Sequence, residues 1–311
     1  MFMRFFLFIF IVLSTASCHK RVAAIHPTTL KALQNRQLTA FNRVTVDGNI
    51  NVNLHTGYSR PQVILRGPTT DLLQVKVGVH GNHLLIYLAK GYPRNGVVSV
   101  DIRGQYLNAF TYRGSGFVTG NRLRSGLMDI SITNPGPTTL GGQISLRKLT
   151  VAGGGQTQIT GISSQHLQLS IVDNSRVQLA GVMNITHLDL DEKAWLAMYW
   201  VKSHALTIRG RGQAFVQLAG IVDKLDVELC DRAHFNGRYL RAKRAFVKTH
   251  DKAVADIAAV NRQHTLATDA SDIYFYNIPT MKTDFMAYQG SVLDMRDWDP
   301  WDPRDYDRYN K

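Results

Sequence analysis

Four carboxylates have the spacing that enzymes acting on polysaccharides use. Asp173 and Glu192 lie roughly twenty residues apart, the length of a unit that repeats along the chain, and Asp189 and Asp191 occupy alternate positions. Two carboxylates held close together can serve as acid and base on a glycosidic bond. Asp173 and Glu192, however, fall in a column of turns, and Asp189 and Asp191 alternate with leucines, as on the outer side of a strand. We therefore predict no catalytic residues, with a polysaccharide lyase or hydrolase as the alternative.

Histidines and cysteines are the residues that would hold a metal ion. His166, His187 and His204 each precede an apolar segment in successive units, which would bring them along one corner. Imidazoles in a row can bind zinc or copper, but no carboxylate or cysteine completes a ligand set at fixed spacing. Cys230 lies in an expected turn, with no base or oxyanion site indicated nearby. We predict no metal site and no cofactor, and an inert thiol at Cys230.

The N-terminus has the composition of an export signal. Residues 1–18 contain the cation Arg4, then an apolar run, then Ser-Thr-Ala-Ser-Cys, the order found in secretory signal peptides. The apolar run is shorter than the ~20 residues that span a bilayer. The end resembles a bacterial lipobox, with Thr15 where an aliphatic residue is usual, and predicts a lipid on Cys18. His19, in place of the aspartate of inner-membrane lipoproteins, favours the outer membrane; a periplasmic or secreted protein is the alternative.

The chain is strongly basic, with 36 Lys and Arg against 23 Asp and Glu and a formal net charge of +13. A balance of this size favours acidic partners. Because export argues against nucleic acid, we expect an acidic glycan, lipopolysaccharide or another envelope protein, besides the membrane that a lipid on Cys18 would reach. The densest run of cations is the candidate ligand-binding patch: Arg238, Arg241, Lys243, Arg244, Lys248 and Lys252.

The elements that must position these residues come from a unit of about twenty residues. Each unit has an apolar start, a polar or glycine-rich turn, alternating apolar residues and usually a closing glycine, as in the segments that begin at Leu149, Leu169, Leu188, Ile208 and Leu225. The closing residues are Gly161, Gly181, Trp200, Gly220 and Gly237. One coil cannot bury its apolar side alone, so such units stack. The predicted fold is all-β, a parallel β-helix or β-solenoid of about twenty residues per coil.

Apolar residues of successive units form three expected inward columns, because residues two apart in a strand face the same side. The first holds Ile159, Leu179, Met198, Leu218, Phe235 and Tyr276, and the second Thr157, Val177, Leu196, Val216, Ala233 and Tyr274. The third consists of the starting residues, continued by Phe246 and Leu266. Between them a turn column is rich in Gly, Asn and Asp, which tolerate left-handed backbone: Asn134-Pro135, Gly153–Gly155, Asp173–Ser175, Glu192-Lys193, Arg211-Gly212, Asp251-Lys252 and Ser271-Asp272.

The chain thus divides into a signal peptide (1–18), a basic tether or short helix (19–36), N-terminal β coils (37–104), solenoid repeats (105–295) and a tail (296–311). The tail alternates Asp and Pro with aromatic residues, which disfavours a helix or a central strand. We expect it to be disordered or to fold back as an end cap. The alternative is an envelope assembly factor that docks a partner through Trp298, Trp301, Tyr306 and Tyr309.

The N-terminal strands resemble the start of the head GIN domain, found in auto-transporter adhesins and bacterial lipoproteins. The matching elements are Phe41, Val44-x-Val46-x-Gly48, Asn49-Ile50-Asn51-Val52-x-Leu54, Gly57, Val63-x-Leu65-x-Gly67, Leu72-Leu73 and Gly81-x-x-Leu84-x-Ile86. With the coils that follow, the resemblance covers roughly residues 38–295. It implies a right-handed β-helix on an exported, often lipid-anchored protein with an adhesion or surface role, and no catalytic residues.

Together these features favour a non-catalytic envelope lipoprotein, adhesin-like, whose stacked coils present a basic, repetitive surface. A rigid ladder of side chains can grip an extended polymer without reordering, and this lowers the entropic cost of binding.

Overall fold

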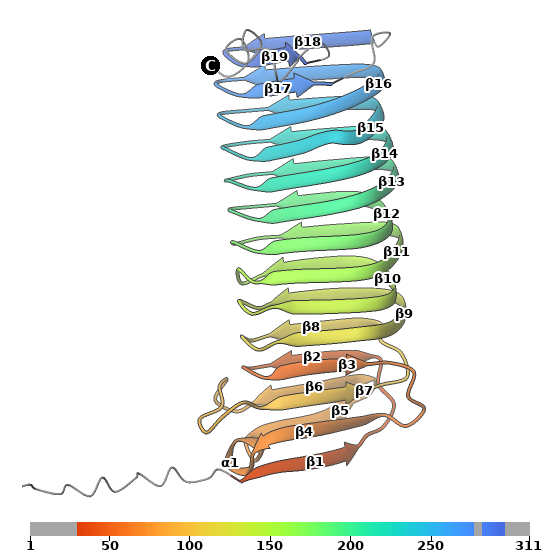
Figure 1. The fold of residues 1–311 in the computed structure, drawn as a ribbon, viewed down its shortest axis with the longest axis vertical. Coiled ribbons are helices and arrows are strands. Elements are labelled where there is room, and N and C mark those ends of the chain that lie inside the picture. The colour runs from red at the N-terminus through yellow and green to blue at the C-terminus, as the bar shows by residue number, and fades with distance from the viewer. Residues whose placement is uncertain (1–29, 277–281, 296–311) are drawn as a thin grey trace, which may run out of the picture.

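The computed structural model describes residues 30–276 and 282–295. The predicted signal peptide, Cys18 and the tail 296–311 lie outside the described residues. The chain forms one tall stack of strands with almost no helix, a parallel β-solenoid of about nine turns (Figure 1). The predicted fold class is therefore confirmed. In the part of the chain that the structure describes, no helix has the length and apolar character needed to cross a membrane.

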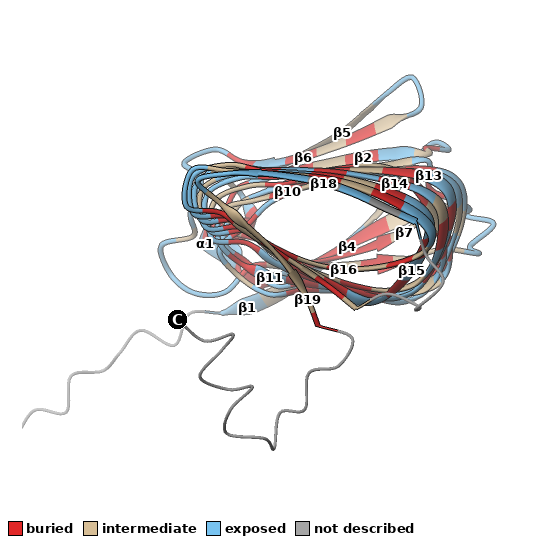
Figure 2. Ribbon diagram, turned by 90° about the horizontal axis from the view of Figure 1, so that it is seen from above, coloured by how far each residue is buried: buried red, intermediate tan, exposed pale blue. Residues whose placement is uncertain are grey.

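Eight long strands make the regular part of the stack, each paired in parallel with the next. They are β9 (Val118–Thr133), β10 (Thr138–Ala152), β11 (Gln156–Ile171), β12 (Arg176–Leu190), β13 (Trp195–Gly210), β14 (Phe215–Leu229), β15 (His234–Thr249) and β16 (Val254–Thr268). Each strand crosses one broad face, bends around a rounded corner and returns along the other face (Figure 2). A tight corner of a few residues then leads into the next coil.

The tight corner has a left-handed residue in coil after coil, as the turn column predicted. Positive φ angles occur at Asp173 (61°), Glu192 (60°), Gly212 (68°), Asp231 (61°) and Asp251 (61°). Carboxylates there accept hydrogen bonds from the coil before: the backbone N–H of Gly153 donates to Oδ2 of Asp173 (2.6 Å) and that of Gly212 to Oδ2 of Asp231 (2.9 Å). Acidic residues therefore serve this corner by satisfying backbone donors.

A single hydrophobic core runs through the stack, from Phe41 to Phe275. The first two predicted inward columns hold through β11 to β14, where Ile159, Leu179, Met198 and Leu218 are opposite one another and buried. The third column holds only as far as Ile208 of β13. Beyond β14 the predicted columns are wrong. Phe246, Leu266, Tyr274 and Tyr276 do not face the core, and the buried positions are taken instead by Val247, Ala267, Ile273 and Phe275.

The error has a definite origin in the register. Leu225 is opposite Leu206 of β13, and not Ile208 as predicted. On its other side, Leu225 is opposite Ala245 of β15. Aligning Leu225 with Phe246 shifts the predicted register by one residue, and such a shift assigns every side chain of the strand to the opposite face. Gly220 is opposite Leu240 in the same way, so Gly237 is not a closing residue. Phe235 pairs with Val216 and belongs to the second column.

The N-terminal region is more complex than the coils predicted for residues 37–104. Residues 31–36, predicted as part of a tether or short helix, belong to strand β1 (Lys31–Gln37), which pairs antiparallel with β4 (Gln62–Pro68). β4 pairs antiparallel with β7 (Ser99–Arg103), and β5 (Val75–His80) with β6 (His83–Leu88). One helical turn, α1 (Thr69–Leu72), follows β4. These antiparallel strands form the lower end of the stack (Figure 1).

The order of strands in this region is not the order of the chain. β2 (Arg43–Asp47) lies between β6 and β8 (Ala109–Arg113), parallel to both. β3 (Asn51–His55) likewise lies between β7 and β9. At the other end, β17 (Asp272–Phe275) and β18 (Lys282–Tyr288) add to β16, and β19 (Ser291–Asp294) adds to β17.

Candidate functional site

The four carboxylates considered for acid-base chemistry occupy structural positions. Asp173 and Glu192 are left-handed residues of the tight corner. On the outer side of β12, Asp189 pairs with His187 at 3.0 Å, and Oδ1 of Asp191 accepts the N–H of Glu192 at 2.7 Å. Asp189 and Asp191 do line a shallow hollow of about 360 Å³ together with Arg209 and Arg211.

The three histidines considered for a metal site do not form a column. His187 is opposite Gln168 and Thr207, whereas His204 lies at the rounded corner and pairs with Asp223, Nδ1 to Oδ2, at 2.8 Å. His166 is exposed just ahead of the rung of Leu167 and Ile185. Within residues 30–276 and 282–295, no group of three or more His, Cys, Asp or Glu is arranged to hold a metal ion.

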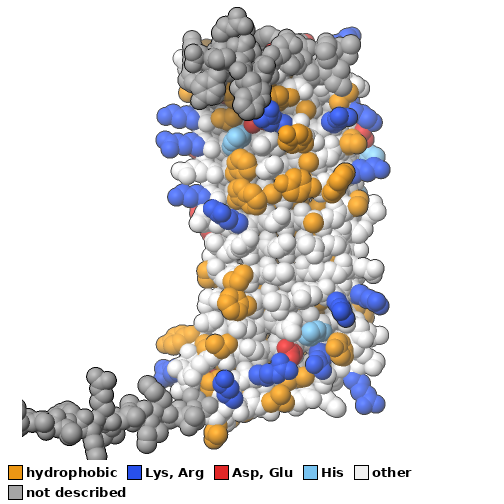
Figure 3. Space-filling model, viewed as in Figure 1, with side chains coloured by type: hydrophobic (Ala, Val, Ile, Leu, Met, Phe, Trp, Pro, Cys, Tyr) orange, Lys and Arg blue, Asp and Glu red, His pale blue; other side chains and the backbone are white. Residues whose placement is uncertain are grey.

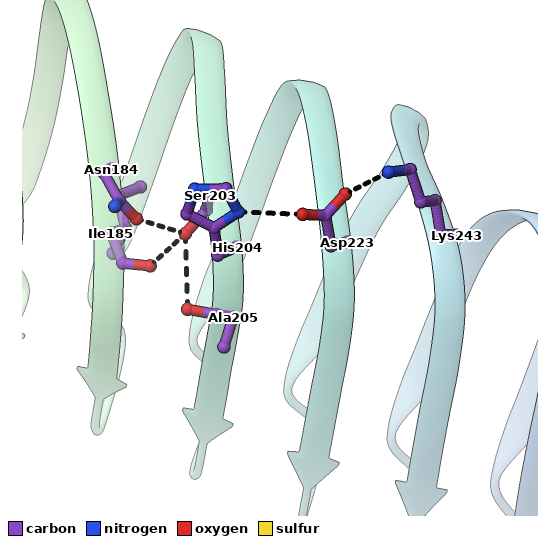
Figure 4. A network of polar contacts seen from close by, with 7 residues as sticks. All are labelled: Asn184, Ile185, Ser203, His204, Ala205, Asp223 and Lys243. Carbon is purple, nitrogen blue, oxygen red and sulfur yellow. Dashed lines mark hydrogen bonds and ion pairs between the residues drawn. The ribbon is translucent and has the colours of Figure 1, made fainter.

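A serine, a histidine and an aspartate come close at the rounded corner without forming a nucleophilic triad (Figure 4). The Ser203 hydroxyl is buried, and its contacts are to Asn184 and to backbone carbonyl oxygens. The neighbouring His204 points outward, its side chain 90% exposed. Asp223 joins His204 to Lys243, and hydrogen bonds from Lys243 and then His204 lower the pKa of the Asp223 carboxyl. The group is an ion-pair chain across coils.

The structure distributes the predicted basic patch around one coil. Five of its six cations lie in β15 and Lys252 follows that strand, which circles the stack, so the six face different directions. Arg238 packs on the ring of Tyr276, 4.1 Å from its centroid, and Lys243 pairs with Asp223 at 2.7 Å. Arg241 and Arg244 are exposed at the rounded corner, Lys248 lies on the second broad face, and Lys252 is at the tight corner. The six therefore do not act as one surface.

The lone described thiol is not activated. Burial raises the pKa of Cys230, and the nearby carboxylates of Glu228, Asp231 and Asp251 raise it further. A nucleophilic cysteine needs the opposite environment, one that favours the thiolate.

A patch of exposed apolar side chains occupies the rounded corner of four successive coils. Its members are Val182, Tyr199, Trp200, Ile221 and Tyr239, here called the aromatic patch, and all are at least 45% exposed. They line a hollow of about 610 Å³ whose border carries the cations Lys202 and Arg241. Hydrophobic side chains gather in the upper half of the stack in Figure 3, with Lys and Arg along both edges of that face. Contiguous exposed apolar surface is a common feature of interaction sites on proteins.

Trp200 is the centre of the patch and its most unusual residue. Its side chain is 78% exposed, and its backbone is left-handed, with φ 68°. A bulky residue rarely adopts this conformation, which costs it about 1–2 kcal/mol. Gly161, at the equivalent corner two coils earlier, has φ 73° and pays no such cost. Backbone strain at a residue whose side chain is mostly exposed is the kind of feature that is concentrated at functional sites.

Reading the sequence missed this site, although it contained a signal. Trp200 interrupts the column of closing glycines, and Tyr199 precedes it. A residue that breaks a structural column is a better pointer to function than the charge runs, because the column gives no structural reason for it.

Comparison with known proteins identifies the family. Residues 40–219 match the family described as "Putative auto-transporter adhesin, head GIN domain". The chain belongs to the head GIN domain family. The resemblance inferred from the N-terminal strands is thereby confirmed. Membership in this family indicates an adhesin-like protein, extracellular or associated with the cell envelope, and favours a binding role over catalysis.

Solved structures of similar fold are described in the same terms. A "putative adhesin" from Parabacteroides merdae is 13% identical, covers 86% of this chain and 97% of its own, and has a TM-score of 0.47. A "putative adhesin" from Parabacteroides distasonis is 12% identical, covers 86% of this chain and 98% of its own, and has a TM-score of 0.48. A "putative lipid binding protein" from the same species is 11% identical, covers 86% and 97%, and has a TM-score of 0.41. No curated protein matches the sequence.

Proposed function

We propose that this head GIN domain protein is a non-catalytic adhesin of the cell envelope that binds glycans through the aromatic patch. The observation that carries the proposal is Trp200: an exposed indole held in the left-handed backbone conformation that Gly161 adopts two coils earlier. Around it, four further apolar side chains from its own and neighbouring coils line the same hollow: Val182, Tyr199, Ile221 and Tyr239.

The chemistry of the patch suits a sugar ring. The face of an aromatic ring carries partial negative charge, which attracts the weakly positive C–H groups on one face of a sugar. Lys202 and Arg241 at the border offer hydrogen-bond donors and positive charge to carboxylates or hydroxyls. Because all these side chains stand on strands that pair in parallel on both sides of the patch, the site needs little reordering when a ligand arrives. An acidic glycan fits both the rings and the charges.

The attachment to the envelope rests on the N-terminus. Lipidation of Cys18 would tether the stack to the outer membrane, and several acyl chains on one residue are enough for stable anchoring. Incorporation of labelled palmitate tests this, with Cys18→Ala as the control. No label in the unsubstituted chain would rule the lipid out and leave a periplasmic or secreted protein.

Glycan binding is tested on an array with the chain from residue 19. We expect binding to acidic glycans that falls at least about tenfold in Trp200→Gly, a change that introduces the residue type of Gly161, which has the same left-handed backbone. Tyr87→Ala is the matched control, since Tyr87 is an exposed aromatic residue on β6, far from the patch. Equal binding by all three chains would reject the patch as the site.

Other occupants of the patch give different results. If lipopolysaccharide is the ligand, the chain will bind lipopolysaccharide but no free glycan. If an envelope protein is the ligand, the chain will capture that protein and bind no glycan. If a second copy of the chain covered the patch, light scattering would show a dimer that Trp200→Gly converts to a monomer. Each of these outcomes contradicts the glycan assignment.

A polysaccharide-active enzyme is the second candidate, favoured by one observation. Asp189, Asp191, Arg209 and Arg211 line a common hollow. The enzyme hypothesis predicts that acidic polysaccharides incubated with the chain yield new reducing or unsaturated ends, and that Asp189→Asn with Asp191→Asn abolishes them. We expect no cleavage, because the two carboxylates are held by His187 and by the backbone of Glu192.

A further inference from the structure

A column of cations runs along the rounded corner, where the strands enter the second broad face. Lys224 of β14 is opposite Arg244 of β15, Arg244 is opposite Arg262 of β16, and Arg262 is opposite Lys282 of β18. All four side chains are exposed. Adjacent coils are ~4.8 Å apart, so the four stand at one regular spacing along the axis of the solenoid. We call these four residues the cation column.

Such a column is unfavourable in the free protein. Like charges directly opposite one another on neighbouring strands repel and lower stability. Local contacts offset this at two of the four positions: Arg262 pairs with Asp284 at 3.3 Å, and the Lys224 ammonium lies 5.5 Å from the centre of the Phe246 ring. Among the described residues, Arg244 has no ion-pair partner within 4 Å. Anions supplied from outside would relieve the repulsion.

The nearest carboxylates do not neutralise the column. Asp223, beside Lys224, is shared by Lys243 and His204. Asp284 is shared by Arg262 and His264. Asp226 lies two residues beyond Lys224 on the outer side of β14, opposite Phe246 and not in the column. The four cations of the column therefore outnumber the carboxylates paired with them, and the column keeps a net positive charge.

The cation column begins where the aromatic patch ends. Arg241 borders the patch and lies in the same strand as Arg244, three residues before it. In the two preceding coils, Arg241 is opposite Ile221, and Ile221 is opposite Lys202. Ile221 and Lys202 both line the hollow of the aromatic patch. A linear ligand that covers the patch and runs along the corner toward the C-terminal end of the stack meets the cations next.

We infer that the cation column binds the carboxylates of a linear polyuronate whose chain lies parallel to the axis of the solenoid. The inference rests on the proposed function, because it extends the glycan that occupies the aromatic patch. An extended sugar unit is about as long as one coil is high, so each uronate can bring its carboxylate to one rung. Arginines in the column can bind carboxylates in a bidentate way, which favours this anion and this geometry.

The test compares two double variants that remove the same charge from different corners. Arg244→Gln with Arg262→Gln breaks the cation column. Arg232→Gln with Lys252→Gln is the matched control, since both residues are exposed at the tight corner. Calorimetry with the chain from residue 19 uses oligogalacturonate of defined length, the methyl-esterified oligomer as the uncharged probe, and inorganic polyphosphate.

We expect the column variant to bind oligogalacturonate about tenfold more weakly and with a smaller dependence on salt. Its binding of the esterified oligomer should not change, and the control variant should behave as the unsubstituted chain. Affinity should also rise with oligomer length up to about the number of rungs. If the column variant unfolds at the same temperature as the unsubstituted chain, or at a higher one, the loss of binding is not caused by a folding defect.

Three outcomes overturn the inference. Equal losses in both double variants would mean that total charge, not the column, attracts the polymer. Polyphosphate bound as tightly as oligogalacturonate would mean that the site does not select carboxylates. Unchanged binding by the column variant would remove the column from the site. The proposed function fails separately, if Trp200→Gly leaves binding of the esterified oligomer intact while the column variant still loses oligogalacturonate.

Discussion

The two corners of each coil differ in what their residues do. At the tight corner, side chains serve the fold: Asp173 and Asp231 accept hydrogen bonds from backbone groups of the preceding coil. At the rounded corner, side chains such as Trp200, Tyr239 and Arg244 extend into solvent and satisfy nothing in the coil. The rounded corner has structural contacts of its own, such as those of Ser203 and Gly220, but it also carries the exposed side chains that we propose to bind ligand. Four experiments test this difference between the corners.

The largest effect is expected at a glycine of the rounded corner. Gly220 has φ 144°, and a Cβ there would lie 2.0 Å from the carbonyl oxygen of Val201 in the coil below. Gly220→Ala should lower the free energy of unfolding by about 3 kcal/mol, measured by denaturant titration. As a control, Gly126→Ala, where a Cβ meets nothing within 4 Å, should cost far less. Equal costs would show that this corner is not closely packed.

A smaller loss is expected at the tight corner. Asp231→Ala removes the acceptor for the N–H of Gly212 and puts alanine at φ 61°, which together should cost about 2 kcal/mol. Asp231→Gly should lose less stability than Asp231→Ala, because glycine adopts the left-handed backbone conformation freely. Asp226→Ala, on the broad face, is the control. Glycan binding should be unaffected by any of the three, and a loss of binding in Asp231→Ala would break the division between the corners.

The third experiment separates stability from binding at the rounded corner. Trp200→Gly relieves the left-handed strain but gives up backbone rigidity, so the free energy of unfolding should change by no more than about 1 kcal/mol. Binding should nevertheless fall. A destabilisation of several kcal/mol on thermal or chemical unfolding would mean that the indole is a structural residue.

The mildest test concerns reactivity. In the chain from residue 19, Cys230 is the single cysteine, and its raised pKa leaves less thiolate at a given pH than an ordinary cysteine has. Alkylation at pH 8 should therefore be slower than for a cysteine in an unfolded peptide, and its rate should rise only above the usual thiol range. Glu228→Gln should speed it modestly. Rapid labelling of the unsubstituted chain would show that this corner is open and not acidic.

The sequence was informative where the backbone is constrained. The period, the left-handed turn column and the inward columns of β11–β14 follow from residues that have no structural alternative, such as Gly212 and Leu179. The register beyond β14 could not be read in this way, because Phe246 and Leu266 are apolar yet face outward, and alanines and threonines occupy the interior. Apolar character alone cannot locate the core when its residues are small.

The sites were harder to predict than the fold. The six cations that looked like one patch follow one another along the chain, and a strand that circles the stack disperses such a run. The cation column instead consists of residues one coil apart, each of which is unremarkable in its own segment. Contacts between coils depend on register, and register was the part of the fold that the pattern of residues did not resolve.

The insertion of β2 and β3 between later strands has a consequence for biogenesis. The partners of β2 are residues 83–88 and 109–113, and those of β3 are residues 99–103 and 118–119. A chain synthesised from its N-terminus therefore leaves β2 and β3 without all their strand partners until residues 83–119 have been made. Contacts this distant along the chain form late and slow the folding reaction. The lower end of the stack is thus completed only after the strands that follow it in the sequence.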